Sequence, residues 1–336
     1  MNINAEKNTV TIIIPIYNEE EVIRNCILSV LNQSYPQELM ELFLIDGCST
    51  DNTLQIINDF VDAYPDFIKV LINNEKTVPY AMNMGISQAG GWFIIRLDAH
   101  AEYPPDYISK CICLLANTDA DNVGGLWKTV GKGYIGEVIA LLLSSSFGVG
   151  NSQYRVNGKS GYVDTVPFGA FRREVFVQLG GFDTRLTRNQ DYEMNYRIRK
   201  NRGKIFLSSD IHCIYYCRNT IKDFSIMGFV NGKWNIITMF LCPGSMGIRH
   251  FIPLLFNVTI IGLSILSVIQ PVFRRILLCE LLLYFTADLI FSIRQSFRSW
   301  KYFPVLFFLY PIFHFSYGFG SLISLLTFRH KNWQFK

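Results

Sequence analysis

The chain has 336 residues, of which half are hydrophobic and only 17% are charged, a low share for a soluble protein. Its formal net charge is +4, but the surplus is local: the residues from Phe251 onward hold eight Lys or Arg and two acids, whereas the first 250 hold 23 bases and 25 acids. This distribution speaks against a nucleic-acid-binding surface and is typical of residues that flank membrane spans.

The cysteines and the N-terminus indicate a cytoplasmic location for the first domain. The eight cysteines form no CxxC pair and no Cys/His spacing typical of zinc, so we expect free thiols in a reducing compartment. The first ten residues lack the apolar core of a signal peptide. We therefore expect the N-terminal domain to stay in the cytoplasm.

The first hundred residues alternate between strand and helix patterns. Val10 to Ile16 is an apolar, β-branched run, in which Pro15 fits only where no ladder hydrogen bond is needed. A helical apolar spacing follows it, and the same alternation continues with strands expected at residues 42–45 and 67–72. A helix at residues 80–88 then precedes an apolar strand that begins at Trp92. This order predicts a doubly wound α/β sheet.

Acidic residues follow three of these strands. Glu19 follows the first, Asp46 ends the second, and Asp98 and His100 end the strand that begins at Trp92. Because ligands of open α/β sheets bind at the carboxyl ends of the strands, we expect these side chains to meet at one edge. A carboxylate and an imidazole two residues apart can hold one divalent cation and, through it, a diphosphate; the alternative is a strand that ends in a polar turn.

The pattern becomes less regular in the middle of the chain. Tyr134 to Leu143 is an apolar helix too short to span a bilayer, and it fits a core position or a membrane-surface position equally well. Gly169 lacks bulk, which allows another group to approach the backbone. Asp191 begins a charged helix, where an acid serves either as a partner of the helix dipole or as a general base.

From Phe251 the chain becomes strongly apolar. Residues 251–273 and 302–328 hold no charge, and residues 276–293 are apolar apart from Glu280 and Asp288. We predict about three membrane segments, at about 251–271, 276–293 and 303–327. The two acids are functional candidates, although a tilted or packed middle segment accounts for them as well.

Basic residues set the expected orientation of these segments. The second connection carries Arg294, Arg298 and Lys301 and is therefore expected in the cytoplasm. Three spans then place the C-terminus outside, yet the final R-H-K-N-W-Q-F-K is also basic.

Four motifs together resemble the inverting family 2 glycosyltransferases: P-I-Y-N-E-E, D-G-C-S-T-D-N-T, L-D-A-H and N-Q-D-Y-E. Longer stretches, such as I-I-R-L-D-A-H-A and V-D-T-V-P-F-G-A-F-R-R-E-V-F, are similar to the succinoglycan-type exopolysaccharide glucosyltransferases of bacteria. The resemblance covers roughly residues 8–235. It implies a cytoplasmic nucleotide-sugar-binding domain of the GT-A type at 1–235, a doubly wound mixed sheet, followed by a membrane region at 236–336.

The resemblance also implies roles for individual residues. Pro15, Tyr17 and Glu19 are expected to frame the nucleoside, and Asp46 is expected to accept a hydrogen bond from uracil. The other residues expected to contact the donor are Lys76 and Asn83 near the diphosphate and Asp98 near the ribose.

The metal and the base follow from the same resemblance. Asp98 and His100 take the two positions of the family's D-x-D, so both are expected to bind the metal, Mn²⁺ or Mg²⁺. Most members have Asp where this chain has His100. Asp191 takes the catalytic-base position, with Gln190 in place of the usual preceding acid.

The implied function is transfer of one hexose, because the Q-x-x-R-W motif of processive members is missing. The expected donor is UDP-glucose, the acceptor a polyprenyl-diphosphate-linked oligosaccharide in exopolysaccharide or capsule synthesis, and the location the inner (plasma) membrane. One alternative is a polyprenyl-phosphate sugar synthase, whose phosphate acceptor needs little help from a base. Another is a non-catalytic transporter or scaffold, against which the intact acids at the strand ends speak.

Overall fold

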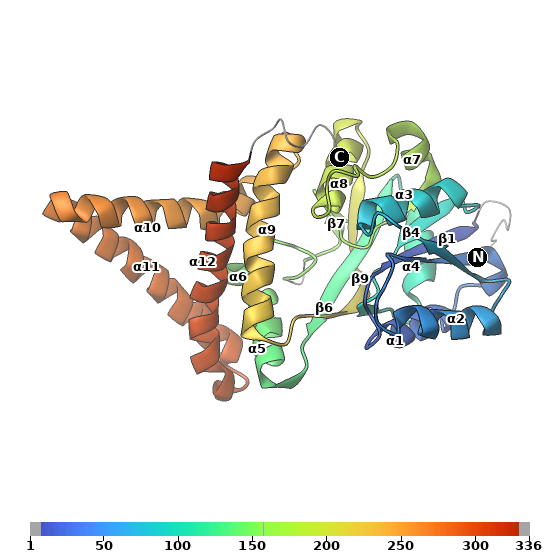
Figure 1. Ribbon diagram of the computed structural model, residues 1–336, viewed down its shortest axis with the longest axis horizontal. Helices are drawn as coiled ribbons and strands as arrows, with labels where there is room; N and C mark the ends of the chain where they lie inside the picture. Colours follow the sequence, from blue (N-terminus) through green and yellow to red (C-terminus); the bar gives the residue numbers. More distant parts are fainter. Residues whose placement is uncertain (1–7, 157, 329–336) are drawn as a thin grey trace. The chain divides into compact units, whose positions relative to one another are not determined.

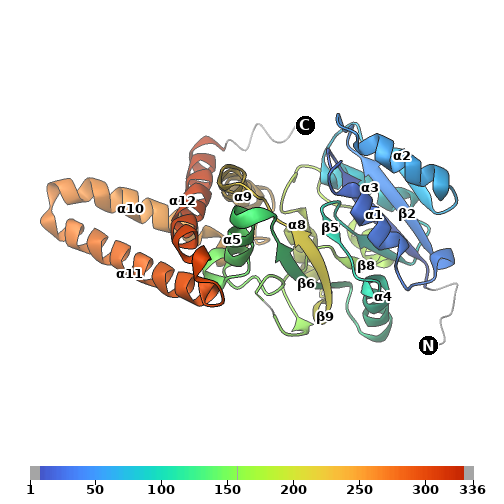
Figure 2. The same cartoon turned by 90° about the horizontal axis from the view of Figure 1, so that it is seen from below.

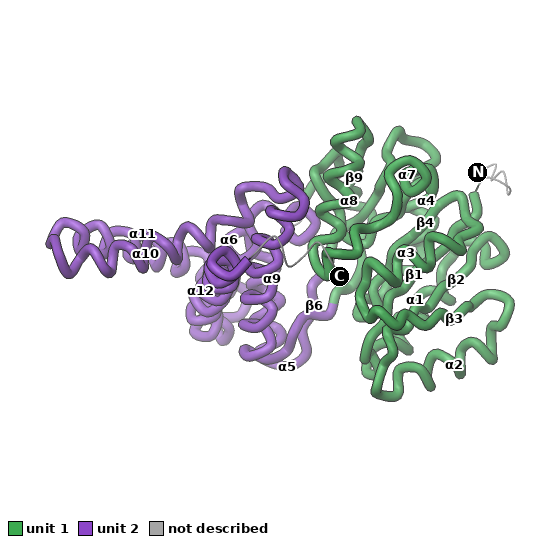
Figure 3. Tube along the Cα trace, turned by 45° about the horizontal axis from the view of Figure 1, so that its top comes forward, with its two compact units in different colours: residues 1–128, 157–215 green, residues 129–156, 216–336 purple. Residues whose placement is uncertain are grey.

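The structure is a computed structural model that describes residues 8–156 and 158–328. It divides into two compact units, coloured differently in Figure 3. The first unit is drawn from residues 1–128 and 157–215, and the second from residues 129–156 and 216–336. The helices at residues 133–143 and 221–241 belong to the second unit, because both pack on the helix at residues 303–327. The domain boundary expected at residue 235 stays a prediction.

The first unit is built on a mixed sheet with the strand order β3-β2-β1-β4-β8-β6-β9-β5. Its parallel part consists of β1 (Val10–Ile16), β2 (Met40–Asp46), β3 (Ile68–Ile72) and β4 (Phe93–Arg96). Helices α1 (Ile23–Leu31), α2 (Thr53–Ala63) and α3 (Val78–Gln88) connect these strands, and the short turn η2 (Gln37–Leu39) lies between α1 and β2. The predicted alternation of strands and helices is therefore confirmed.

The antiparallel part continues the same sheet beyond β4. Its strands are β8 (Ala170–Arg172), β6 (Asn122–Val130), β9 (Ile205–Tyr216), β5 (Ala101–Glu102) and β7 (Gly161–Tyr162), the last of which pairs with β9. Its helices are α4 (Tyr107–Asn117), α7 (Arg173–Leu179) and α8 (Gln190–Lys200).

Helices cover both faces of the parallel part. The alternating residues Ile12 and Ile14 pack with α1 and α2 in the main apolar core. Ile13 points to the other face, where Gly85 of α3 lies so close that a Cβ there would come within 2.8 Å of its side chain. Figure 1 shows α3 on one side of these strands and α1 and α2 on the other. Burial on both faces explains why the strands are almost continuously apolar.

The strand register brings the predicted site residues to one edge. β1 and β2 end together at the pair Ile16–Asp46, and β4 ends earlier on the same side of the sheet, where Arg96 pairs with Ile13. The loops that begin at Tyr17, Gly47 and Leu97 therefore leave the sheet side by side, as the sequence predicts.

The second unit is helical. Its helices are α5 (Gly133–Leu143), α6 (Ser146–Val149), α9 (Ile221–Leu241), α10 (Ile252–Ile269), α11 (Pro271–Ser296) and α12 (Phe303–Thr327), with the turns η3 (Ile248–Phe251) and η4 (Trp300–Tyr302). Among the described residues, three helical segments, 248–269, 271–296 and 300–327, are long and apolar enough to cross a membrane. They lie where the sequence predicts membrane segments. The apolar face of α5 is buried and packs on α12, which corresponds to the core alternative.

Candidate active site

The loops after β1 and β2 are joined by hydrogen bonds. The Gly47 N–H donates to the Ile16 carbonyl oxygen at 2.8 Å, and the Asn18 N–H donates to Ser49 Oγ at 2.9 Å. The Asn18 side chain in turn accepts from the Thr50 N–H at 2.8 Å. Asn18 has a φ of 53°, a left-handed conformation that Asn tolerates better than most residues. The P-I-Y-N and D-G-C-S-T motifs thus form one structural element.

Asp46 fixes the second of these loops. Its carboxylate is buried and accepts hydrogen bonds from the N–H of Ser49 at 2.9 Å and from its hydroxyl at 2.6 Å. Beside it, a Cβ on Gly47 would lie 3.5 Å from the Cα of Lys76. The loop that carries Lys76 therefore lies against the sheet edge. The contacts expected of Asp46 with uracil and of Lys76 with a diphosphate stay predictions.

Glu19, which follows β1, lies at this edge beside Asp98 and His100, which both follow β4. His100 Nδ1 is 3.2 Å from Asp98 Oδ1 and 3.3 Å from Glu19 Oε1. The loop is held by Tyr103, whose hydroxyl oxygen accepts the Asp98 N–H at 2.7 Å. A carboxylate and an imidazole this close can share one divalent cation, and their donor types suit Mn²⁺.

The protein supplies only part of a coordination sphere here. Within residues 8–156 and 158–328, no three His, Cys, Asp or Glu side chains are arranged as a complete metal site. A cation at Asp98 and His100 would need further ligands from a diphosphate and water, which is common for cations that act on phosphates. The Asp98–His100 pair fits such a metal.

Arg96 joins the two halves of the site, and the sequence analysis did not identify it. Its side chain is buried at the end of β4, where it forms an ion pair with Asp191 and lies 3.9 Å from Asp98 Oδ2. A buried guanidinium requires such carboxylate partners. The signal in the sequence is the single charge in the otherwise apolar run before L-D-A-H.

Asp191 lies in the first turn of α8 with 24% of its side chain exposed. Burial raises the pKa of its carboxyl group, Arg96 opposes that rise, and the negative charge of Asp98 adds to it. The net effect is a pKa above the ordinary value for Asp, which moves it closer to that of an effective base. The position fits both roles expected from the sequence, a general base and a partner of the helix dipole, because a carboxylate in the first turn interacts favourably with that dipole.

A buried amide network holds α8 in this position. Asn195 accepts a hydrogen bond from Asn122 at 2.6 Å and donates to Thr165 Oγ1 at 2.8 Å. Thr165 belongs to the V-D-T-V-P-F motif, so the network links that motif to α8, the helix whose first turn contains Asp191. Asn122 also explains why residue 169 is a glycine, because a Cβ at that position would lie 2.3 Å from Asn122 Oδ1. The group that approaches this glycine is thus part of the protein itself.

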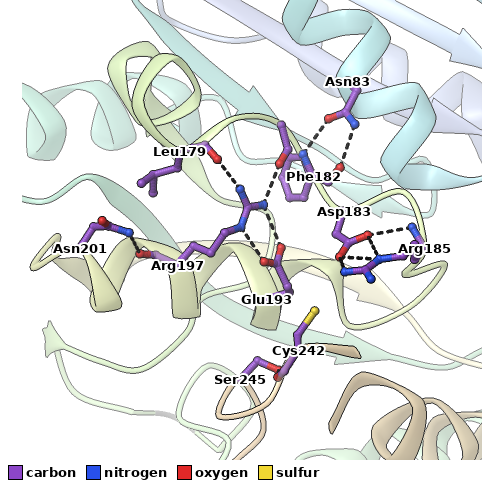
Figure 4. Close-up of polar contacts among 11 residues, drawn as sticks. Asn83, Leu179, Phe182, Asp183, Arg185, Glu193, Arg197, Asn201, Cys242 and Ser245 are labelled. Carbon is purple, nitrogen blue, oxygen red and sulfur yellow. Dashed lines mark hydrogen bonds and ion pairs between the residues drawn. The ribbon is translucent and has the colours of Figure 1, made fainter. Parts of the chain in front are cut away.

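Asn83 and Arg197 fasten the loop before α8, shown in Figure 4. Asn83 donates to the Phe182 carbonyl oxygen at 2.8 Å and accepts from the Phe182 N–H at 2.7 Å. Arg197 donates to the carbonyl oxygens of Leu179 and Gly181, each at 2.7 Å, and pairs with Glu193. Asn83 therefore has a structural role beside the diphosphate contact predicted for it.

The fold and the sequence both match known proteins. The family model "Glycosyl transferase family 2" matches residues 11–180. A dolichyl N-acetyl-alpha-D-glucosaminyl phosphate 3-beta-D-2,3-diacetamido-2,3-dideoxy-beta-D-glucuronosyltransferase of Methanococcus voltae is 30% identical over 225 residues, which are 65% of this chain and 70% of that protein. The succinoglycan biosynthesis protein ExoA of Rhizobium meliloti is 27% identical over 245 residues, 72% and 74% of the two chains.

Among solved structures, the mannosyltransferase PcManGT from Pyrobaculum calidifontis, in complex with GDP-Man and Mn²⁺, aligns with a TM-score of 0.60 at 17% sequence identity. The alignment covers 91% of this chain and 86% of that chain. Residues 1–349 of S. aureus TarS align with a TM-score of 0.50 at 18% identity, over 96% and 93% of the two chains. At these identities the likeness shows the fold alone, which is the GT-A fold.

Proposed function

Because this chain belongs to glycosyl transferase family 2, we propose that it transfers a hexose, with inversion, from a nucleotide sugar to a hydroxyl group of a lipid-linked oligosaccharide. The observation that carries this proposal is the group Asp98, His100, Arg96 and Asp191. It combines a pair suited to a metal-bound diphosphate with a separate carboxylate of raised pKa.

Inversion requires one displacement, so the site needs a base and a stabilised leaving group but no nucleophilic residue. Asp191 accepts the proton of the attacking acceptor hydroxyl. Arg96 orients the Asp191 carboxylate and keeps it ionised. Asp98 and His100 would hold a divalent cation, and such a cation would neutralise the charge that develops on the leaving diphosphate. Glu19 and Asp46 remain for the nucleoside.

Aromatic rings beside the metal pair support a sugar-binding role. Tyr215 lies edge-to-face with His100, at a centroid distance of 5.5 Å, and is stacked on Trp127 at 4.2 Å. All three residues belong to the first unit. Apolar sugar faces pack on such rings, and a phenol or indole N–H at the rim can bind a hydroxyl group.

The apolar helices and the names of the relatives support this acceptor class. The Methanococcus voltae protein is named for a dolichyl-phosphate-linked sugar, and the Rhizobium meliloti protein for succinoglycan biosynthesis. An acceptor with a polyprenyl diphosphate tail stays in the bilayer while its sugar reaches the catalytic unit. We place the enzyme in the plasma membrane with this unit in the cytoplasm, acting in exopolysaccharide or capsule synthesis with a UDP-linked donor, UDP-glucose first among them.

The test is a donor screen with membranes that contain the full chain. Each nucleotide sugar is supplied with Mn²⁺ or Mg²⁺, and both the released nucleoside diphosphate and the labelled lipid are measured. Metal-dependent transfer to the lipid fraction from one donor supports the proposal. Transfer to a polyprenyl phosphate, with Asp191 dispensable, would instead identify a polyprenyl-phosphate sugar synthase. No donor consumption under any condition would refute the proposal.

A further inference from the structure

Helices α9 and α12 form a tightly packed parallel pair. At one end the rings of Phe224 and Phe313 stack at 4.7 Å, and at the other end the rings of Phe240 and Phe328 stack at 5.0 Å. Residue numbers increase together from the first contact to the second, so both helices run in the same direction. The C-terminal end of α9 and the N-terminal end of α12 therefore lie at opposite ends of the pair.

Small residues make this pairing close along its length. A Cβ on Gly232 would lie 1.9 Å from the Tyr317 carbonyl oxygen, and one on Gly320 would lie 1.9 Å from that of Phe229. Ser321 Oγ also donates to the Gly232 carbonyl oxygen at 3.0 Å. Such backbone contact is typical of fixed helix pairs. Helices α9 and α12 must therefore take the same orientation to a membrane.

Helices α10 and α11 form a hairpin with a different character. In the most apolar 18-residue stretch of each helix, only 6% of α10 and 11% of α11 is buried within the protein. The corresponding share is 39% for the segment that contains α12. Figures 1 and 2 show the hairpin extending away from α12, with α10 running crosswise to it. Spans of one bundle tilt by no more than about 40° from the bilayer normal. The hairpin and α12 thus do not share the direction expected of three spans.

The order of the helices along the chain gives the same result. If α10 and α11 both cross the bilayer, the chain returns to the side it left, so the end of α9 and the start of α12 lie on one side. These are opposite ends of the parallel pair. A pair that crossed the bilayer would have these ends on opposite sides. A spanning hairpin and a spanning α9–α12 pair are therefore incompatible.

We propose that only α10 and α11 span the bilayer, and that the α9–α12 pair lies along the membrane surface with one face of α12 in the lipid. This inference rests on the membrane attachment included in the proposed function. It places the end of α12 on the same side as the catalytic unit, and the hairpin turn, with Arg274 and Arg275, on the other.

The side chains of the pair suit a bilayer surface. Phe308, Phe319, Ile323 and Leu326 lie on one face of α12 by their spacing and are 67%, 45%, 45% and 77% exposed. The partner helix α9 carries the exposed Lys233 near its middle. Such a residue would lie at the bilayer centre if the pair crossed it, whereas at the surface it reaches the headgroups.

The start of α12 adds a group of headgroup-binding residues. Arg294, Arg298 and Lys301 are exposed there, next to Trp300, which is 57% exposed. Lys and Arg with an interfacial Trp are typical of a membrane surface that faces anionic lipids. This arrangement assigns Arg294, Arg298, Lys301 and the basic residues that follow α12 in the sequence to the cytoplasmic side, against Arg274 and Arg275 on the other side. The excess of basic residues is therefore cytoplasmic, as the positive-inside rule requires.

The first experiment determines the sidedness of the full chain. Epitope tags at the N-terminus and at the C-terminus, and a protease site inserted after Gln270, are probed in right-side-out and inverted membrane vesicles. We expect both tags on one side and the inserted site on the other. Tags on opposite sides would overturn the proposal and restore three spans. A hairpin site on the same side as the N-terminus would show that the hairpin does not span, so the membrane anchoring in the proposed function would fail instead.

The second experiment measures depth along α12. Tryptophan replaces Phe308, Phe319 or Leu326, and quenching by lipids brominated near the headgroup or near the chain end is compared with the parent chain. Ile261→Trp in the middle of α10 is the deep control. The three α12 positions should show equal, shallow quenching. A deep signal at position 319 between two shallow ones would overturn the proposal, as would no quenching at all three, which would mean that protein covers this face.

Discussion

Asp191 and Glu193 occupy the same helix turn but have different partners, and a pair of amide variants tests the different roles that we propose for them. Asp191 pairs with Arg96 at the site, whereas Glu193 is 5% exposed and pairs with Arg197 under the loop before α8. Asp191→Asn keeps the shape and an acceptor oxygen but cannot take a proton at neutral pH. General-base catalysis is typically worth about 10²–10⁴-fold, so kcat should fall by about that factor.

For stability we expect the opposite order: Glu193→Gln should destabilise the protein more than Asp191→Asn. Glu193→Gln leaves Arg197 without its charged partner; breaking a fully buried ion pair costs about 3–5 kcal/mol, and partial exposure of Arg197 reduces this to about 1–3 kcal/mol. Without Glu193 to orient it, Arg197 should also hold the carbonyl oxygens of Leu179 and Gly181 less firmly, so the midpoint of thermal unfolding should fall. In the folded protein, however, kcat and its pH dependence should remain near the wild type.

The assay combines single-turnover transfer, nucleoside diphosphate affinity and thermal unfolding for both variants. Asp191→Asn should lose turnover while its affinity for the diphosphate changes little, because Asp98 and His100 remain. Wild-type turnover by Asp191→Asn would refute the assignment of the base. A dead Glu193→Gln protein with normal stability would move that role to Glu193.

Three further predictions concern the residues around this pair. Asp191 must be ionised to act as a base, so the rate should fall as the pH decreases through a pKa above that of an ordinary Asp. Arg96 opposes the rise in the pKa of Asp191. In Arg96→Gln that opposition is lost, so the acid limb of the pH–rate profile should move to higher pH. An imidazole ligand at His100 should favour Mn²⁺ over Mg²⁺, so His100→Asp should bring the Mn²⁺-supported and Mg²⁺-supported rates closer together, and equal activity in excess chelator would contradict a metal role. Asn83→Ala removes two hydrogen bonds to Phe182 and should cost about 1–3 kcal/mol in denaturant unfolding, whereas the exposed Ser87→Ala on the same helix should cost less than about 0.5 kcal/mol.

Much of the catalytic unit follows from local patterns in the sequence. Apolar β-branched runs such as Val10 to Ile16 predict strands, and the helical spacing between them predicts a doubly wound sheet, because both patterns reflect burial repeated over a few residues. Parallel strands place their carboxyl ends at one edge, so the proximity of Glu19, Asp98 and His100 was predictable from the sequence.

The pairings between distant segments depended on tertiary structure. Arg96 and Asp191 are 95 residues apart, and Asn83 and Phe182 are 99 apart, so neither pair leaves a periodic signal in the sequence. Their contact depends on where α8 and its preceding loop pack, which side-chain shape and the Asn195 network decide.

The membrane region shows the same division. Hydropathy identifies three apolar helices among the described residues, because it depends only on the composition of each segment and not on the helices packed beside it. Only packing reveals that α12 is bound along α9 and runs crosswise to α10. The sequence thus determined which segments are apolar enough for lipid, and the G-F-V-N-G spacing at residues 228–232 marks a close-packing face of α9. Only the tertiary structure decided that this face packs on α12, where Gly232 and Gly320 allow backbone contact, because the two helices are distant in the sequence.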